Sequence, residues 1–249
     1  MGCTDLERID LPESVTDIED DAFVGCENLQ SVTIPDSVTK IGNSAFFACG
    51  LKSIALPDSI TFIDNNAFCN CVNLQSVTIP KNVLSIKAFV FQGCENLQSV
   101  MIPDSVTIIG EGAFYECENL RDITIPASVK SIGDTAFIGC KSLADSDGFV
   151  IVKSVLYYYC GSASDITIPE GVTNIGVFAF GMNKILQNVT ILENVKSIGD
   201  KAFFGCTNLH TVTIPHSVTS IGNKAFDNEI LEIMMIPNGV KIIFKPRKR

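Results

Sequence analysis

The sequence lacks the segments that mark membrane and exported proteins. No apolar run reaches the roughly 18 residues that a membrane helix needs, and the longest candidate, residues 149–160, is broken by Lys153 and Ser154. No apolar stretch follows Met1, so the N-terminus does not have the form of a secretory signal. These absences predict a chain without a membrane span that is either intracellular or a fragment of a longer protein.

Basic residues are scarce outside the last few positions. The chain has 28 acidic and 18 basic residues, and four of the basic ones lie within residues 245–249. The remaining chain is therefore strongly acidic and should repel the phosphate backbone of nucleic acids. We predict no nucleic-acid partner, and we expect residues 245–249 to form a solvated basic tail.

Motifs for catalysis or metal binding are also missing. The sequence contains no G-x-S-x-G, H-E-x-x-H, P-loop or C-x-x-C pattern. Its two histidines, His210 and His216, occupy different repeat positions and cannot form a shared site. We therefore predict no catalytic residue, no metal, no cofactor and no enzymatic activity. A carbohydrate-active solenoid enzyme is the third alternative, but it would need acidic and basic groups converging in one groove, which the sequence does not provide.

What the sequence does have is an internal repeat of about 23 residues. Its clearest copy runs from Leu29 through Ile34-Pro35 and Ile41-Gly42 to Cys49, and roughly ten turns are expected. One wider gap holds an irregular short repeat at 144–165. The repeat is marked by one recurring position, which is Pro in every copy but one: Pro12, Pro35, Pro57, Pro80, Pro103, Pro126, Pro169, Leu192, Pro215 and Pro237.

Within each unit the residue pattern predicts short strands. Val32 and Ile34 alternate with Ser31 and Thr33, so the first pair should point inward and the second outward. A second alternating segment at 38–41 predicts another ladder, and 43–46 predicts a helical turn capped by an Asx residue. The expected fold is therefore α/β and strand-rich, a solenoid with parallel β ladders and short helical turns.

Phenylalanine recurs at one repeat position along nearly the whole chain. Equivalent side chains stacked coil upon coil should form one continuous apolar core. We therefore predict a single solenoid over 1–244, followed by the tail at 245–249. The column consists of Phe23, Phe46, Phe68, Phe91, Phe114, Phe137, Phe180, Phe203 and Phe226.

Seven of the ten cysteines also share one repeat position. The same column admits Asn183 and Glu229, which indicates a column of small residues rather than a set of disulfides. Neighbouring members should lie about 4.8 Å apart with parallel side chains, an arrangement that opposes bridging. We predict reduced thiols at Cys26, Cys49, Cys71, Cys94, Cys117, Cys140 and Cys206.

The consensus LxxVTIPxSVTxIGxxAFxxCxxL resembles the BspA-like, or Treponema-type, leucine-rich repeat over roughly residues 6 to 244. The irregular segment FVIVKSVLYYYCGSASDITIP is similar to a short variant repeat of that family. The resemblance implies a right-handed leucine-rich-repeat solenoid on surface or secreted proteins, often adhesive toward host or matrix proteins. It implies no catalytic residues.

The outward positions of the first ladder form the candidate binding face. We expect a concave strip of small, mostly hydroxylated side chains, which suits extended contact with a protein. The alternative is that Ser and Thr are simply favoured on the wet face of any ladder. The candidate residues are Ser31, Thr33, Ser53, Ser76, Thr78, Ser99, Asp122, Thr124, Asp165, Thr167, Asn188, Thr190, Thr211 and Thr213.

Two non-catalytic functions remain open from the sequence. The family resemblance favours a protein-binding module of an adhesive cell-surface protein, whereas the missing signal sequence and the unpaired thiols favour an intracellular protein-interaction scaffold. The apolar last strand, Ile233–Ile236, predicts either self-association through this edge or a longer natural chain. The role of the cluster Tyr157–Tyr159 is left open.

Overall fold

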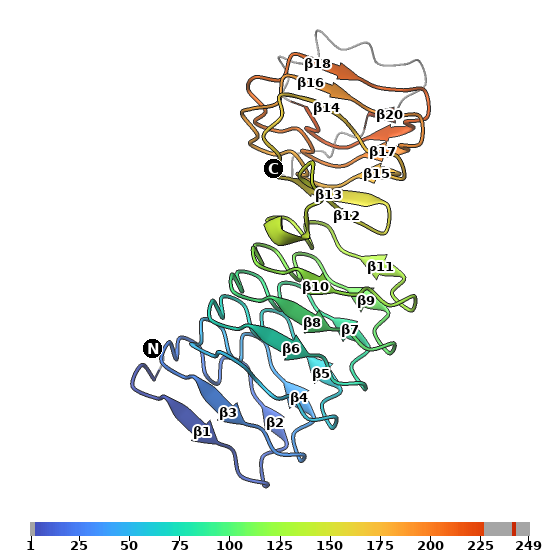
Figure 1. Cartoon of the computed structure of the whole chain (residues 1–249). Helices are drawn as coiled ribbons and strands as arrows, with labels where there is room; N and C mark the ends of the chain where they lie inside the picture. The colour runs from blue at the N-terminus through green and yellow to red at the C-terminus, as the bar shows by residue number, and fades with distance from the viewer. Residues whose placement is uncertain (1–2, 227–240, 243–249) are drawn as a thin grey trace, which may run out of the picture. The chain divides into compact units, whose positions relative to one another are not determined.

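The computed structural model describes residues 3–226 and 241–242. The chain divides into two compact units, unit 1 at Met1–Leu143 and unit 2 at Ala144–Arg249. Each is a strand-rich parallel β-solenoid, and the described residues hold about nine turns (Figure 1). A single solenoid over 1–244 stays a prediction, and the irregular repeat predicted at 144–165 lies at the start of unit 2. The tail at 245–249 and the edge Ile233–Ile236 lie outside the described residues.

In unit 1 the first ladder carries the Ser-Val-Thr segments in the expected register. Its strands pair in parallel, with Ser76 opposite Ser99 and Thr78 opposite Met101. The ladder is interrupted at residues 53–55, which form no strand. This segment directly follows Cys49-Gly50-Leu51, where the repeat is one residue shorter than in the other coils of the unit. The strands are β1 (Arg8–Asp10) with β3 (Ser31–Thr33), and then β6 (Ser76–Thr78), β8 (Ser99–Met101) and β10 (Asp122–Ile123).

A second parallel ladder runs alongside the first in unit 1. Its two-residue strands place one isoleucine inward, as at Ile41 and Ile109, both fully buried. The strands form two sheets, β2 (Asp17–Ile18), β4 (Lys40–Ile41) and β5 (Phe62–Ile63), then β7 (Ser85–Ile86), β9 (Ile108–Ile109) and β11 (Ser131–Ile132).

Unit 2 begins with an antiparallel hairpin of β12 (Phe149–Val152) and β13 (Val155–Tyr159). Strand β13 then pairs in parallel with the second ladder, so the hairpin forms the first layer of that ladder. The further strands are β14 (Asp165–Thr167), β16 (Asn188–Thr190) and β18 (Thr211–Thr213) of the first ladder, and β15 (Asn174–Ile175), β17 (Ser197–Ile198), β19 (Ser220–Ile221) and β20 (Lys241–Ile242) of the second.

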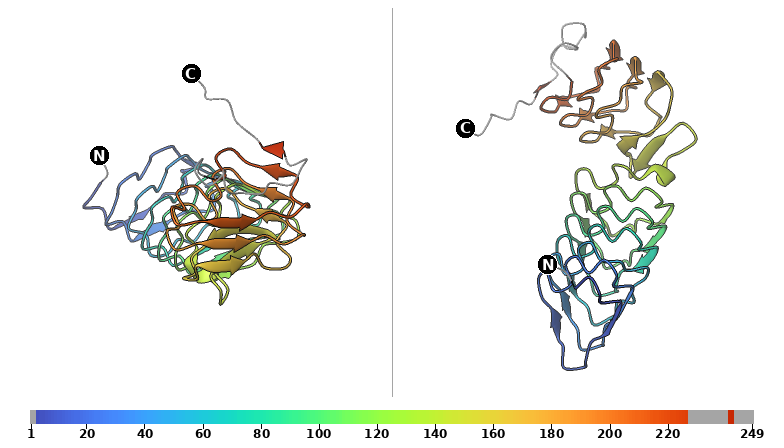
Figure 2. Two further views of the ribbon diagram at one scale, coloured as in Figure 1. Left: turned by 90° about the horizontal axis from the view of Figure 1, so that it is seen from above. Right: turned by 90° about the vertical axis from the view of Figure 1, so that its left-hand side faces the viewer.

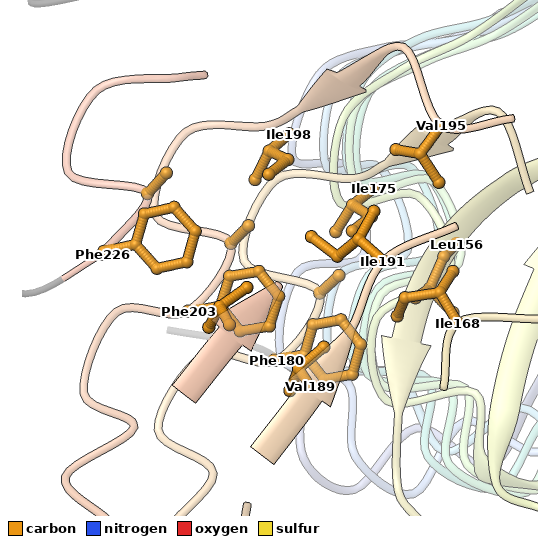
Figure 3. Close-up of a cluster of buried hydrophobic side chains, with 14 of the residues drawn as sticks. Leu156, Ile168, Ile175, Phe180, Val189, Ile191, Val195, Ile198, Phe203 and Phe226 are labelled. Atoms are coloured by element: carbon orange, nitrogen blue, oxygen red, sulfur yellow. The ribbon is translucent and has the colours of Figure 1, made fainter. Parts of the chain in front are cut away.

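The phenylalanine column forms the predicted core spine inside each unit. Successive rings stack nearly parallel, with centroids 5.2–5.7 Å apart from Phe23 to Phe137 in unit 1. In unit 2 the rings of Phe180, Phe203 and Phe226 stack at 4.7 and 5.1 Å and lie in one row inside the apolar cluster (Figure 3). Stacked identical side chains therefore fill the interior from coil to coil.

The predicted short helical turns are wrong. The only helix in the described part of the chain is the three-residue 3-10 segment η1, Lys141–Leu143. In the segment after the second ladder, alternate backbone amides donate to the next coil rather than along a helix, as Phe46 N does to Ala67 O at 2.8 Å. Left-handed residues such as Ser44 and Ala48, with φ of 53° and 54°, turn the backbone so that these bonds form.

The Asx residues predicted to cap helices bond across coils instead. Asp20 Oδ1 accepts a hydrogen bond from the amide of Asn43 in the next coil at 2.8 Å, and Asp200 Oδ1 accepts one from Asn223 at 2.8 Å. Hydrogen bonds therefore join neighbouring coils at the turns as well as at the strands. Figure 2 shows the coils of each unit stacked on one another.

Candidate protein-binding face

The predicted binding residues of unit 1 lie on one face, the outer side of its first ladder. All are exposed except Ser99, which is half-buried. The ladder places Ser76, Ser99 and Asp122 in one column. Thr124 directly follows β10, and Ser53 lies where the ladder is interrupted. The structure therefore brings together Ser76, Thr78, Ser99, Asp122 and Thr124 on one three-stranded sheet. Ser31 and Thr33 lie on the two-stranded sheet β1–β3, before the interruption.

This face is hollowed around Met101. A shallow pocket of about 410 Å³ is lined by Ser99, Val100, Met101, Ile102, Asp122 and Thr124. The side chain of Met101 is 68% exposed although it occupies a ladder position that holds Thr in most coils. Exposed methionine adapts its shape to different apolar partners. Sequence reasoning left Met101 out of the site, and its departure from the Thr column is the signal that could have identified it.

In unit 2 the predicted residues form two complete columns on three strands. Asp165, Asn188 and Thr211 make one column, and Thr167, Thr190 and Thr213 make the other. All six side chains are exposed, while Val189 and Val212 between them are buried. The alternation predicted from the sequence is therefore confirmed on this ladder.

The carboxylates at the start of each first ladder are held by neighbouring hydroxyl, amide and guanidinium groups. The Thr33 hydroxyl donates to Asp10, and the Arg8 guanidinium lies 3.2 Å from the same carboxylate. Both interactions lower the pKa of Asp10, and the hydrogen bond from Thr33 has the larger effect. In unit 2, hydrogen bonds from the Ser164 hydroxyl and the Asn188 amide lower the pKa of Asp165, and that from Ser164 has the larger effect. Both carboxylates stay ionised at neutral pH, and Arg8 offsets the charge of Asp10.

The cysteine column lies in the core, away from the first-ladder face. From Cys49 onward, each thiol of the column donates to the backbone carbonyl oxygen of the phenylalanine in the preceding coil, as Cys94 Sγ does to Phe68 O at 3.1 Å and Cys117 Sγ to Phe91 O at 3.0 Å. All ten cysteines are free. The column therefore consists of hydrogen-bond donors to the backbone, a role that the sequence did not reveal.

Within residues 3–226 and 241–242, no cluster of three or more His, Cys, Asp or Glu side chains is arranged to hold a metal ion. The same part of the chain contains no helix long and apolar enough to cross a bilayer.

Comparison with solved structures finds the same architecture. A leucine-rich cell surface protein from Faecalibacterium prausnitzii is 33% identical, with a TM-score of 0.68, over 96% of this chain and 69% of that one. A leucine-rich repeat protein from Bacteroides ovatus, at 22% identity and a TM-score of 0.56, is matched over 98% of this chain and 76% of its own. The pneumococcal vaccine antigen PcpA, at 23% identity and a TM-score of 0.64, is matched over 96% of this chain and 68% of its own. No curated protein matches the sequence.

A family model for the BspA type leucine-rich repeat region matches residues 1–106, 61–149 and 150–245. These matches cover nearly the whole chain and agree with the consensus, the stacked phenylalanine column and the two parallel ladders. The chain belongs to the BspA-type leucine-rich-repeat family.

Proposed function

We propose that this chain is a non-catalytic protein-binding module of a cell-surface protein, and that its first-ladder face binds an extracellular host or matrix protein. The observation that carries the proposal is the face of unit 1, where the exposed Met101 lies in a shallow pocket with Ser99, Asp122 and Thr124 beside it. A polar surface with an exposed apolar side chain at its centre resembles the polar rim and apolar core of protein interfaces.

Two further observations support this function. The similar protein from Faecalibacterium prausnitzii is described as a cell surface protein. The side chains on the face are short and are presented by ladder strands, so they lose little conformational entropy when a partner covers them. The cell-surface location is transferred from the relative and is part of the proposal.

The binding test replaces exposed threonines on the face by lysine. The double variant Thr78→Lys/Thr124→Lys should bind a partner at least ten-fold more weakly, because two long charged side chains would have to be desolvated at the interface. Biolayer interferometry of the whole chain against a panel of purified matrix glycoproteins measures the affinity.

The matched control makes the same change on the other ladder. Thr39→Lys/Thr219→Lys alters two exposed threonines outside the first-ladder face and should bind like the wild type. Unchanged binding by the double variant would show that the face is not the site, and failure of the wild type to bind any member of the panel would contradict a matrix-binding role.

A further inference from the structure

Three apolar side chains are exposed on the second ladder of unit 1, which the proposed function does not use. Phe62, Leu84 and Ile108 are 36%, 65% and 48% exposed. They lie on three successive coils, in β5, directly before β7 and in β9. Phe62 and Ile108 occupy one repeat position, and Leu84 occupies the position before it. In the other coils of the unit these two positions are polar, as at Asp17, Thr39, Lys40, Lys130 and Ser131. Folding of the ladder therefore does not require apolar residues at these positions.

Three lysines surround these apolar side chains. Lys40 is the ladder partner of Phe62, and Lys87 Nζ lies 5.4 Å from the centroid of the Phe62 ring. The amide of Lys130 donates to Thr107 O at 2.8 Å, which places Lys130 on the coil after Ile108. We call Phe62, Leu84 and Ile108, together with these lysines, the second-ladder patch.

The charges of the patch are available to a partner. Lys81 and Lys141 of the same unit form ion pairs with Asp58 and Glu118, both at 2.6 Å. Among the described residues, none of the three patch lysines has a carboxylate within ion-pair distance. The carboxylates at equivalent positions of this ladder are Asp17, opposite Lys40, Glu19 on the first coil, and Asp64, whose Oδ1 accepts a hydrogen bond from the Asn65 amide at 2.8 Å. The apolar side chains are thus flanked by three lysines that have no ion-pair partner in the described part of the chain, whose net charge is −10 over its full length.

The spacing of the apolar side chains matches that of an α-helix lying across the coils. Two ladder spacings separate Phe62 from Ile108, or roughly 10 Å, and residues i and i+7 of a helix are also about 10 Å apart. Leu84 lies between them in the neighbouring column, where a helix presents residue i+4. Lys40 and Lys130 lie one coil beyond either end of this triad, where they can meet acidic side chains that flank the helix.

We propose that the second-ladder patch binds an acidic amphipathic helix of a partner protein, with apolar residues at i, i+4 and i+7 and carboxylates beside them. A second copy of the chain fits less well, because a two-fold contact through the patch would bring its lysines close to those of the first copy. The proposal concerns a different face from that of the proposed function and can fail independently of it.

The test uses a labelled synthetic 18-residue peptide with leucines at the repeating i, i+4, i+7 positions, glutamates beside them and alanines elsewhere. Fluorescence anisotropy with the whole chain should show saturable binding. Leu84→Glu should weaken binding at least ten-fold, because it places a carboxylate at the centre of the apolar contact. Lys40→Glu/Lys130→Glu should also weaken it at least ten-fold and reduce its dependence on salt.

Two controls separate the patch from general stickiness. Val72→Glu changes another exposed apolar side chain of unit 1, 40% exposed and outside the patch, and should leave the affinity unchanged. A peptide with lysines in place of the glutamates should bind at least ten-fold more weakly than the acidic one.

Four outcomes would overturn the proposal. They are no binding of the acidic peptide at millimolar concentration, equal binding by the Leu84→Glu chain, co-sedimentation with anionic phosphatidylserine vesicles that Leu84→Glu abolishes, and a dimer in analytical ultracentrifugation that Leu84→Glu dissociates. The third would identify the patch as a lipid-binding surface, and the fourth would assign it to a second copy of the chain.

Discussion

Raising the pH from 8 to 11 is expected to unfold unit 1, because its folded state holds a column of neutral thiols. Cys71, Cys94, Cys117 and Cys140 are fully buried, and each Sγ donates to a backbone carbonyl at 3.0 or 3.1 Å. Burial raises the pKa of all four above the ordinary value of 9.0. It also raises the pKa of Cys49, to about 12.

The sign of the effect follows from where the thiols ionise. In the unfolded chain they lose their protons near pH 9, whereas in the folded unit they keep them to higher pH. The stabilisation is therefore complete below pH 9 and is lost as the pH rises toward the folded pKa values. Each fully buried thiol should lower the free energy of unfolding by about 1.4 kcal/mol per pH unit in this window. Four such thiols together lower it by roughly 5 kcal/mol per unit, a large part of a typical domain's stability.

Circular dichroism during an alkaline titration, with a reducing agent present, measures this transition. The variant Cys94→Ala/Cys117→Ala removes two of the titrating groups, so its free energy of unfolding should fall by about 2.8 kcal/mol less per pH unit above pH 9 than that of the wild type, although it is less stable at pH 7. A folded unit 1 at pH 11, or the same pH dependence in wild type and variant, would contradict the assignment of these thiols as the cause.

The register and the core of this fold could be predicted from the sequence because the repeat fixes them. A period of about 23 residues aligns equivalent side chains whatever the details of the turn, so the stacking of Phe46 on Phe68 followed from the alignment alone. The conformation of the turn did not follow. Asn43-Ser44-Ala45-Phe46 has the local pattern of a capped helix, but hydrogen bonds to the next coil, which no local pattern shows, determine its backbone.

The irregular segment shows the same limit. Its sequence predicted strands but gave no role to the tyrosines. In the structure the Tyr159 ring lies 4.9 Å from that of Phe149 and 5.5 Å from that of Phe180, so Tyr159 takes the place of a phenylalanine in the core spine. This substitution became visible only when the antiparallel pairing of β12 with β13 was known.

The outward columns of the first ladder followed from the repeat, whereas their role in binding stays a prediction. Averaging over the repeat identified Thr and Ser as the outward residues, but an interface depends on the positions that depart from the average. Met101 and Leu84 are such positions, each apolar where most coils have threonine. Their exposure, 68% and 65%, could not be read from the sequence, because an apolar residue at an irregular position could equally have been buried.

Replacing Phe91 by alanine is expected to lower the free energy of unfolding of unit 1 by about 3–5 kcal/mol. Its ring is fully buried and lies 5.7 Å from that of Phe68 and 5.7 Å from that of Phe114, so its loss leaves a cavity between two coils. Because each coil contacts only its neighbours, the cavity should weaken the stacking on both sides of it. Urea denaturation followed by circular dichroism measures the change.

Phe62→Ala is the matched control for this change, since it removes the same side chain from an exposed position on a neighbouring coil. It should cost less than about 1 kcal/mol, because the ring is already partly hydrated and leaves no cavity. An equal loss in the free energy of unfolding for the two variants would mean that the phenylalanine column does not form the core. The stacked rings would then not explain how short repeats with so little regular secondary structure are held together.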